Sequence, residues 1–96
     1  MKPHARLSPQ EIEAALAALP GWSLANGKLH REFRFPDFVQ AFGFMTRAAL
    51  LAESMDHHPE WCNVYGRVVV DLTTHASGGI TALDVEFARR MDALAG

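Results

Sequence analysis

Histidine is the residue type in this chain of 96 residues that is best suited to do chemistry. Three of its five histidines, His57, His58 and His75, fall within nineteen positions. Imidazole titrates near pH 6.5 in model peptides, so one ring can donate a proton while another accepts one at neutral pH. The grouping therefore suggests general acid–base catalysis.

Two other interpretations of these histidines stay open. A histidine at the end of an element is often a surface residue or a partner for a helix end. Three histidines also suit zinc, but the adjacent His57 and His58 tend to point in different directions, and Cys62 is the only cysteine. We favour acid–base work and expect no metal.

Carboxylates near the histidines are candidates for orienting them. Glu53 precedes His57 by four residues, one helical turn, and is expected to hold His57 in one tautomer unless it is an ordinary exposed carboxylate. Asp56 has the same two interpretations. Asp84 follows Thr81 by three residues, which is typical of an acid at a helix start.

The elements that position these residues are predicted by a capping box of Ser8 and Glu11, the hairpin turn signal Asn26-Gly27, a flexible loop at 77–79 and hydrophobic spacing. The expected elements are a helix from Ser8 to 19, strands at 22–24 and 28–35, a helix at 38–54, strands at 61–65 and 67–74, and a helix that begins at Thr81. This helix-strand-strand-helix-strand-strand-helix order predicts an α+β fold, with a four-stranded antiparallel sheet and three helices packed on one face.

The second predicted hairpin has a geometric consequence for the histidines. Pro59 and residues 72–74 lie at similar distances from the turn near Gly66, so His57, His58 and His75 should meet at one end of the sheet. Binding and catalytic groups favour such element ends.

Apolar residues predict which surfaces are buried. The long helix at 38–54 is expected to bury a stripe of Phe38, Phe42, Met45, Ala49 and Ala52, widened by Leu50 and Leu51. Trp22 is expected in the core or at its rim, and Cys62 as a small buried residue. Arg31 interrupts the alternation of its strand, which suggests an exposed strand end.

Composition bounds the class of protein. Hydrophobic residues make up 49% and charged residues 21% of the chain, which excludes a disordered protein and fits one domain over residues 1–96. The net charge of −2 gives no electrostatic reason to expect nucleic acid or an anionic membrane as partner. With no apolar run of about 18 residues and no secretory signal in residues 1–10, we expect a cytoplasmic protein.

The run from Glu53 to Trp61, followed by residues 63–65, Thr74-His75, 79–81 and Asp84, resembles the pterin-4a-carbinolamine dehydratase family. The Glu, the His-His-Pro-Glu-Trp run, the later Thr-His and the downstream Asp all stand at the spacing of that family. Gly21-Trp22 matches as well, and the resemblance spans about residues 7–95. Cys62 departs from it, since an aromatic residue is common there.

The resemblance implies dehydration of 4a-hydroxytetrahydropterin to quinonoid dihydropterin, which recycles the cofactor of aromatic amino-acid hydroxylases, without a metal or bound cofactor. It implies that His57, His58 and His75 share the acid and base roles and that Glu53 orients His57. The residues implied to bind the pterin are Asp56, His57, His58, Pro59, Thr73, Thr74, His75, Ala76 and, nearby, Trp22 and Asp84.

The resemblance also leaves a runner-up function. Some animal members form dimers and tetramers and assist a homeodomain transcription factor, so a non-catalytic interaction module is the alternative, as is a pterin-binding or hydroxylase-regulating protein. A module of that kind would need an exposed apolar helix face. A homo-oligomer is expected in either case, with an aromatic amino-acid hydroxylase as a possible partner.

Overall fold

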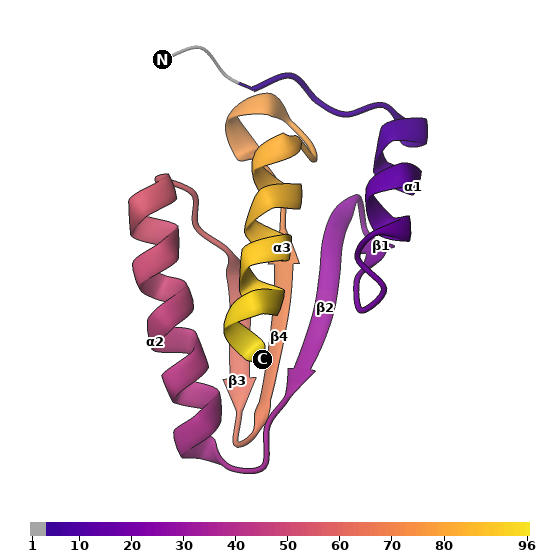
Figure 1. Ribbon diagram of the computed structural model, residues 1–96. Helices are drawn as coiled ribbons and strands as arrows, with labels where there is room; N and C mark the ends of the chain where they lie inside the picture. The colour runs from indigo at the N-terminus through magenta and orange to yellow at the C-terminus, as the bar shows by residue number, and fades with distance from the viewer. Residues whose placement is uncertain (1–3) are drawn as a thin grey trace.

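A computed structural model describes residues 4–96 of the protein. Its elements in chain order are α1 (Pro9–Ala17), β1 (Ser23–Ala25), β2 (Lys28–Arg34), α2 (Phe38–Met55), β3 (Glu60–Val64), β4 (Arg67–Leu72), the short 3-10 helix η1 (His75–Ser77) and α3 (Ala82–Ala95) (Figure 1). The predicted order of helices and strands is confirmed. The unpredicted element, η1, overlaps the start of the expected loop at 77–79.

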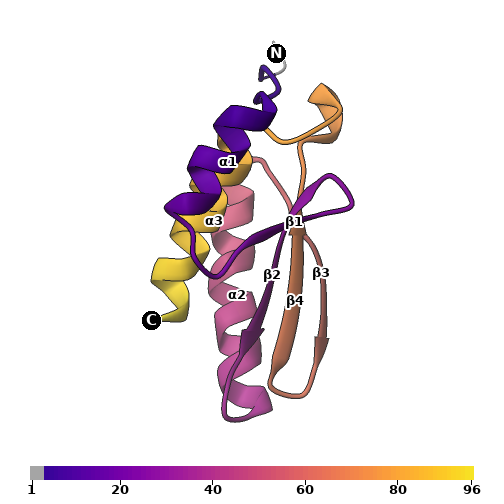
Figure 2. The ribbon, with the colours of Figure 1, turned by 90° about the vertical axis from the view of Figure 1, so that its right-hand side faces the viewer.

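The sheet is antiparallel throughout and has the strand order β1-β2-β4-β3. All three long helices lie on one face of this sheet, as the side view shows (Figure 2). Val68, Val70 and Leu72 of β4 are fully buried beneath them, and the intervening residues of β4 face the other side. This alternation is the period of two that places one face of a strand against a core.

Side-chain caps define where the helices begin. The Ser8 hydroxyl accepts from the Glu11 amide at the start of α1, and the Glu11 carboxylate accepts from the Ser8 amide. The same reciprocal arrangement joins Thr81 and Asp84 at the start of α3. Both boxes follow the predicted spacing, and each satisfies amides that a helix start would otherwise leave unpaired.

The buried face of α2 differs from the predicted one. Ala41, Phe44, Ala48 and Ala52 are its buried residues. Of the predicted stripe, Ala52 is buried, Met45 and Leu51 are partly buried, and the exposed members are Phe38, Phe42, Ala49 and Leu50. The helix is apolar on two sides, and the side rich in alanine packs on the sheet, where small side chains let the backbones approach closely.

Two smaller expectations are also corrected. Arg31 is not at an exposed strand end but lies on the helix-facing side of β2, where its Nη1 is 2.5 Å from Oδ1 of Asp92 and its guanidinium carbon is 4.2 Å from the centre of the Phe33 ring. Cys62 is exposed rather than buried, because it falls on the uncovered face of the sheet.

Within residues 4–96, no helix is both long and apolar enough to cross a membrane.

Candidate active site

The end of α2 determines where the first two histidines lie. Asp56 closes the helix in the left-handed conformation, with φ 50° and ψ 45°, and its amide donates to the carbonyls of Ala52 and Glu53. The His57 amide also donates to the Ala52 carbonyl, at 3.0 Å. This left-handed closure is a common way to end a helix. It turns the chain away from the helix axis at His57.

The hairpin of β3 and β4 then brings the third histidine to the same place. Glu60 is paired with Asp71 in the sheet, so the residues before β3 and those after β4 lie at one end. They surround a cavity of about 510 Å³, lined by His4, Met55, Asp56, His57, His58, Thr73, Thr74, His75, Ala76 and Leu83. The predicted convergence of the three histidines is therefore present.

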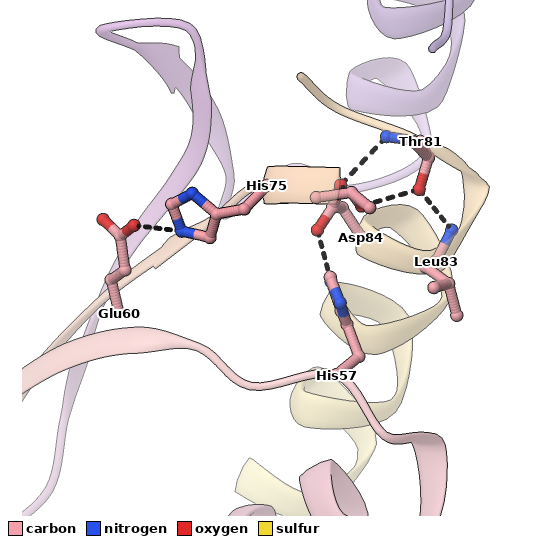
Figure 3. A network of polar contacts seen from close by, with 7 residues as sticks. His57, Glu60, His75, Thr81, Leu83 and Asp84 are labelled. Atoms are coloured by element: carbon pink, nitrogen blue, oxygen red, sulfur yellow. Dashed lines mark hydrogen bonds and ion pairs between the residues drawn. The ribbon is translucent and has the colours of Figure 1, made fainter. Parts of the chain in front are cut away.

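His57 is anchored from behind the cavity by a buried carboxylate. Its Nε2 lies 2.5 Å from Oδ1 of Asp84, which has no exposed surface. The other carboxylate oxygen of Asp84 accepts from the Thr74 hydroxyl at 2.8 Å. The same oxygen accepts from the Thr81 amide at 2.9 Å (Figure 3). Asp84, the acid of the capping box of α3, thus also fixes the ring of His57. Its contacts with Thr74 and Thr81 hold the carboxylate in the position that meets this ring.

Glu53 does not orient His57, which corrects the expectation from sequence. Its Oε1 lies 2.7 Å from Nε2 of His58, and both side chains are exposed. The spacing of four residues from Glu53 to His57 would match one helical turn only if the helix continued. The left-handed conformation of Asp56 ends it first, so the next histidine along the chain meets Glu53.

His75 faces a third carboxylate. Its Nε2 lies 2.9 Å from Oε2 of Glu60, and Figure 3 shows the His75 ring directed toward Glu60 and away from Asp84. Each of the three predicted histidines, His57, His58 and His75, therefore pairs with its own carboxylate through Nε2. Within the described part of the chain, no three His, Cys, Asp or Glu side chains are placed to hold one metal ion.

Some residues expected to bind a ligand lie outside the cavity lining. Trp22 is in the core, where its Nε1 donates to Asp92 at 2.8 Å and its ring meets Phe33 edge-on, so the structure does not bring Trp22 to the cavity. Pro59 is next to the lining residues His57 and His58 without being one of them. Asp84 lies behind His57.

Sequence reasoning missed four residues of this region. Met55 and Leu83 line the cavity, and each is adjacent in sequence to a residue that was expected there. Glu60 belongs to the His-His-Pro-Glu-Trp run and could have been found from it. No local pattern indicated His4, whose carbonyl accepts from the Ser77 hydroxyl.

Known proteins are similar to this chain in sequence and in fold. Residues 5–94 match the family profile described as "Pterin 4 alpha carbinolamine dehydratase". A protein of Solibacter usitatus that carries the name "Putative pterin-4-alpha-carbinolamine dehydratase" is 60% identical over 90 residues, which cover 94% of this chain and 95% of that protein. A protein of Prochlorococcus marinus with the same name is 50% identical over 88 residues, 92% of each chain.

Two solved structures resemble the protein. The crystal structure of a "transcriptional coactivator/pterin dehydratase" from Brucella melitensis has a TM-score of 0.91 and 53% identity, covering 95% of this chain and 99% of that one. A pterin dehydratase-like protein described as a RuBisCO assembly factor in the alpha-carboxysome has a TM-score of 0.65 and 28% identity, covering 78% and 87%. This chain belongs to the pterin-4-alpha-carbinolamine dehydratase family.

Proposed function

We propose that the protein converts 4a-hydroxytetrahydropterin to quinonoid dihydropterin and water. The observation that carries the proposal is that three of the histidines lining the cavity, His57, His58 and His75, are each held through Nε2 by a carboxylate. A cavity of about 510 Å³ also suits a ligand the size of a pterin, since small-molecule sites commonly measure about 300–1,000 Å³.

The reaction needs two proton transfers. The bond between C4a and its hydroxyl oxygen breaks, and a general acid gives that oxygen the proton with which it leaves as water. A ring nitrogen gives up its own proton to a general base, and its electron pair completes the new carbon–nitrogen double bond. A positioned acid or base typically contributes about 10²–10⁴ in rate.

The histidine–carboxylate pairs are suited to both roles. A carboxylate only accepts hydrogen bonds, so each pair favours a proton on Nε2 of the histidine. A neutral ring held in this way has a lone pair on Nδ1 and can act as base, whereas a protonated ring has a proton on Nδ1 and can act as acid. His57, His58 and His75 therefore share the two roles, with Asp84, Glu53 and Glu60 as their respective partners.

Substrate contacts follow from the lining of the cavity. Asp56 lies on one side, and Thr73, Thr74 and Ala76 lie on the other, beside the three histidines. Backbone groups of this lining offer donors and acceptors to the polar edge of a pterin, apart from groups that bond within the chain, such as the Thr74 amide and carbonyl, which bond to Gly79 and Ser77. Pro59 stiffens the segment that follows His58. Trp22 has no part in this arrangement.

A direct assay tests the proposal. A phenylalanine hydroxylase generates 4a-hydroxytetrahydropterin in the cuvette, and its decay is followed by ultraviolet absorbance with and without the protein. We expect faster decay, and loss of most of the acceleration in His58→Ala and His75→Ala. His30→Ala is the matched control, because His30 also pairs with a carboxylate, Asp71 at 2.8 Å, but does not line the cavity. Decay at the spontaneous rate, or full activity in all the cavity variants, would refute the dehydratase.

The exposed apolar side of α2 supports the second part of the proposal, a homo-oligomer. Phe38, Val39, Phe42 and Leu50 are exposed along one side of the helix, opposite its buried alanines. We propose that a second copy of the chain covers this side. If the protein proves to have no dehydratase activity, the same surface favours an interaction module, since the two similar structures are described as a transcriptional coactivator and a RuBisCO assembly factor. A hydroxylase is then a partner to test.

The chain has one cysteine, Cys62, which the structure shows to be exposed and unbridged. A protein without disulfides fits a reducing compartment. We therefore propose that it works in the cytoplasm, where it would take its substrate from a hydroxylase. Fractionation of cells followed by immunoblotting tests this location.

A further inference from the structure

Glu60 connects a cavity histidine with a lysine from a different strand. One carboxylate oxygen of Glu60 accepts from Nζ of Lys28 at 2.5 Å, and the other lies 2.9 Å from Nε2 of His75. The three residues are the first residues of β2, β3 and η1, and they are 32 and 15 positions apart in sequence. The fold, rather than the local chain, brings them together.

The register of the sheet explains how Lys28 reaches Glu60. Leu29 faces the core and pairs with Leu72, so Lys28 lies on the opposite face of the sheet beside Thr73. Glu60 is on that same face, because it pairs with Asp71, which also points away from the core. The lysine side chain therefore crosses β4 on the uncovered face and meets the carboxylate from β3.

Lys28 holds the Glu60 carboxylate in place and extends its ionised form to lower pH. The pKa of the Glu60 carboxyl is lowered, mainly because Lys28 donates a hydrogen bond to it, and His75 adds to the effect. Glu60 is thus a carboxylate at neutral pH, and a carboxylate can only accept. The contact selects the tautomer of His75 with its proton on Nε2, which leaves Nδ1 as the nitrogen without a carboxylate partner.

We propose that Glu60, fixed by Lys28, is the positioning residue of His75 in the dehydration reaction. This inference rests on the dehydratase proposed above and adds to it Lys28 and the positioning role of Glu60. His75 is more exposed than His57 and His58, with 77% of its side chain accessible, so little besides the Glu60 contact holds its ring in place. Loss of Glu60 would leave a histidine of the right type with an undefined orientation and tautomer.

The first test measures the ring of His75 directly, without substrate. Long-range ¹H–¹⁵N correlation spectra at a pH where the ring is neutral report which nitrogen bears the proton. We expect mostly the Nε2–H tautomer in the wild type and a mixture of tautomers in Glu60→Ala. Glu60→Gln retains an oxygen that can accept, so it should preserve part of the preference. An unchanged tautomer in Glu60→Ala overturns the proposal, whatever the activity of the protein.

The second test is kinetic. We expect kcat of Glu60→Ala to fall about 10- to 100-fold, a part of the about 10²–10⁴ that a positioned acid or base contributes, with KM within about twofold of the wild type. Lys28→Met should lower kcat less, since Glu60 remains. Asp71→Ala is the matched control: this carboxylate is the sheet partner of Glu60 but binds His30, which does not line the cavity. A shifted tautomer with unchanged kcat would overturn the role in proton transfer.

The two proposals fail in different ways. If His75→Ala is fully active, the part assigned to His75 in the dehydratase is wrong, and Glu60 has no catalytic group to position. If His75→Ala is impaired while Glu60→Ala equals Asp71→Ala in kcat, the dehydratase stands and the positioning role of Glu60 is wrong. Circular dichroism of each variant shows that the fold is retained.

Discussion

The Nε2 atom of His57 lies 2.5 Å from Oδ1 of Asp84, and this carboxylate is entirely buried. The pair joins the turn after α2 to the first turn of α3, two segments that are 27 positions apart. A buried carboxylate is stable only when donors surround it, and here a histidine, a hydroxyl and a backbone amide do so. The cavity and the fold therefore depend on the same group.

This arrangement makes Asp84 important for stability. In Asp84→Asn, an amide nitrogen replaces one oxygen and cannot accept from Thr74, Thr81 or His57, so at least one buried donor loses its partner. We expect the free energy of unfolding, measured with urea, to fall by about 1–3 kcal/mol. Asp37→Asn is the matched control, because asparagine caps a helix about as well as aspartate does. Equal stability of the two variants would contradict this account.

The sequence was sufficient for the parts of the fold that local chemistry decides. The capping boxes at Ser8 and Thr81 and the turn at Asn26-Gly27 were found where predicted, because they depend on residues at most a few positions apart. The gathering of the histidines also followed, since pairing two strands about the turn near Gly66 fixes which residues meet.

The failures arose where the sequence offered two equivalent choices. The apolar residues of α2 are compatible with burial of either of two sides, and hydrophobic spacing cannot say that Ala41 and Ala48, rather than Phe38 and Phe42, meet the sheet. The partner of Glu53 depended on one backbone conformation, that of Asp56, which a helical spacing rule assumes to be helical. The resemblance placed Trp22 at the site, but its packing on Phe33 and its hydrogen bond to Asp92 hold it in the core.

Glu53 should matter for activity but not for stability. Its contact with His58 joins two exposed side chains, and exposed ion pairs contribute about 0–1 kcal/mol. We expect Glu53→Ala to leave the free energy of unfolding within about 0.5 kcal/mol of the wild type and to lower kcat about tenfold, because His58 loses its orientation. Glu13→Ala, a change of an exposed carboxylate outside the cavity lining, is the control for both measurements. A Glu53→Ala variant as active as Glu13→Ala would remove Glu53 from the site.

The pH dependence of stability should include a contribution from Glu86. Hydrogen bonds from Arg89 and then Arg90 lower its pKa from 4.5 to about 2. A pKa that is lower in the folded state stabilises the fold above the unfolded value, and this stabilisation is lost as pH falls through the folded value. The free energy of unfolding of Glu86→Gln should therefore lie below that of the wild type by a constant amount above about pH 5. This deficit should shrink from pH 4.5 downward and vanish near pH 2.

Urea unfolding of the two proteins across this pH range measures the difference. Glu86 is partly exposed to solvent, so the deficit should be small and should decrease further in high salt, which screens such charges. If the deficit in the free energy of unfolding grew as the pH fell, the contacts of Glu86 with Arg89 and Arg90 would not be its cause.

The exposed side of α2 predicts how the protein associates. Phe42 and Leu50 have 54% and 68% of their surface accessible in the single chain, so they contribute little to its own core. A stable interface buries about 1,200–2,000 Å² in total, and a stripe of large apolar side chains along an 18-residue helix offers the centre of one.

Size-exclusion chromatography with light scattering measures the mass of the particle. We expect the wild type to elute as an oligomer, and the double variant Phe42→Ser, Leu50→Ser to elute as a folded monomer. Leu24→Ser removes a similarly exposed apolar side chain from β1 and should leave the mass unchanged. A monomeric wild type, or a double variant with the mass of the wild type, would show that this side of α2 does not bind a second copy.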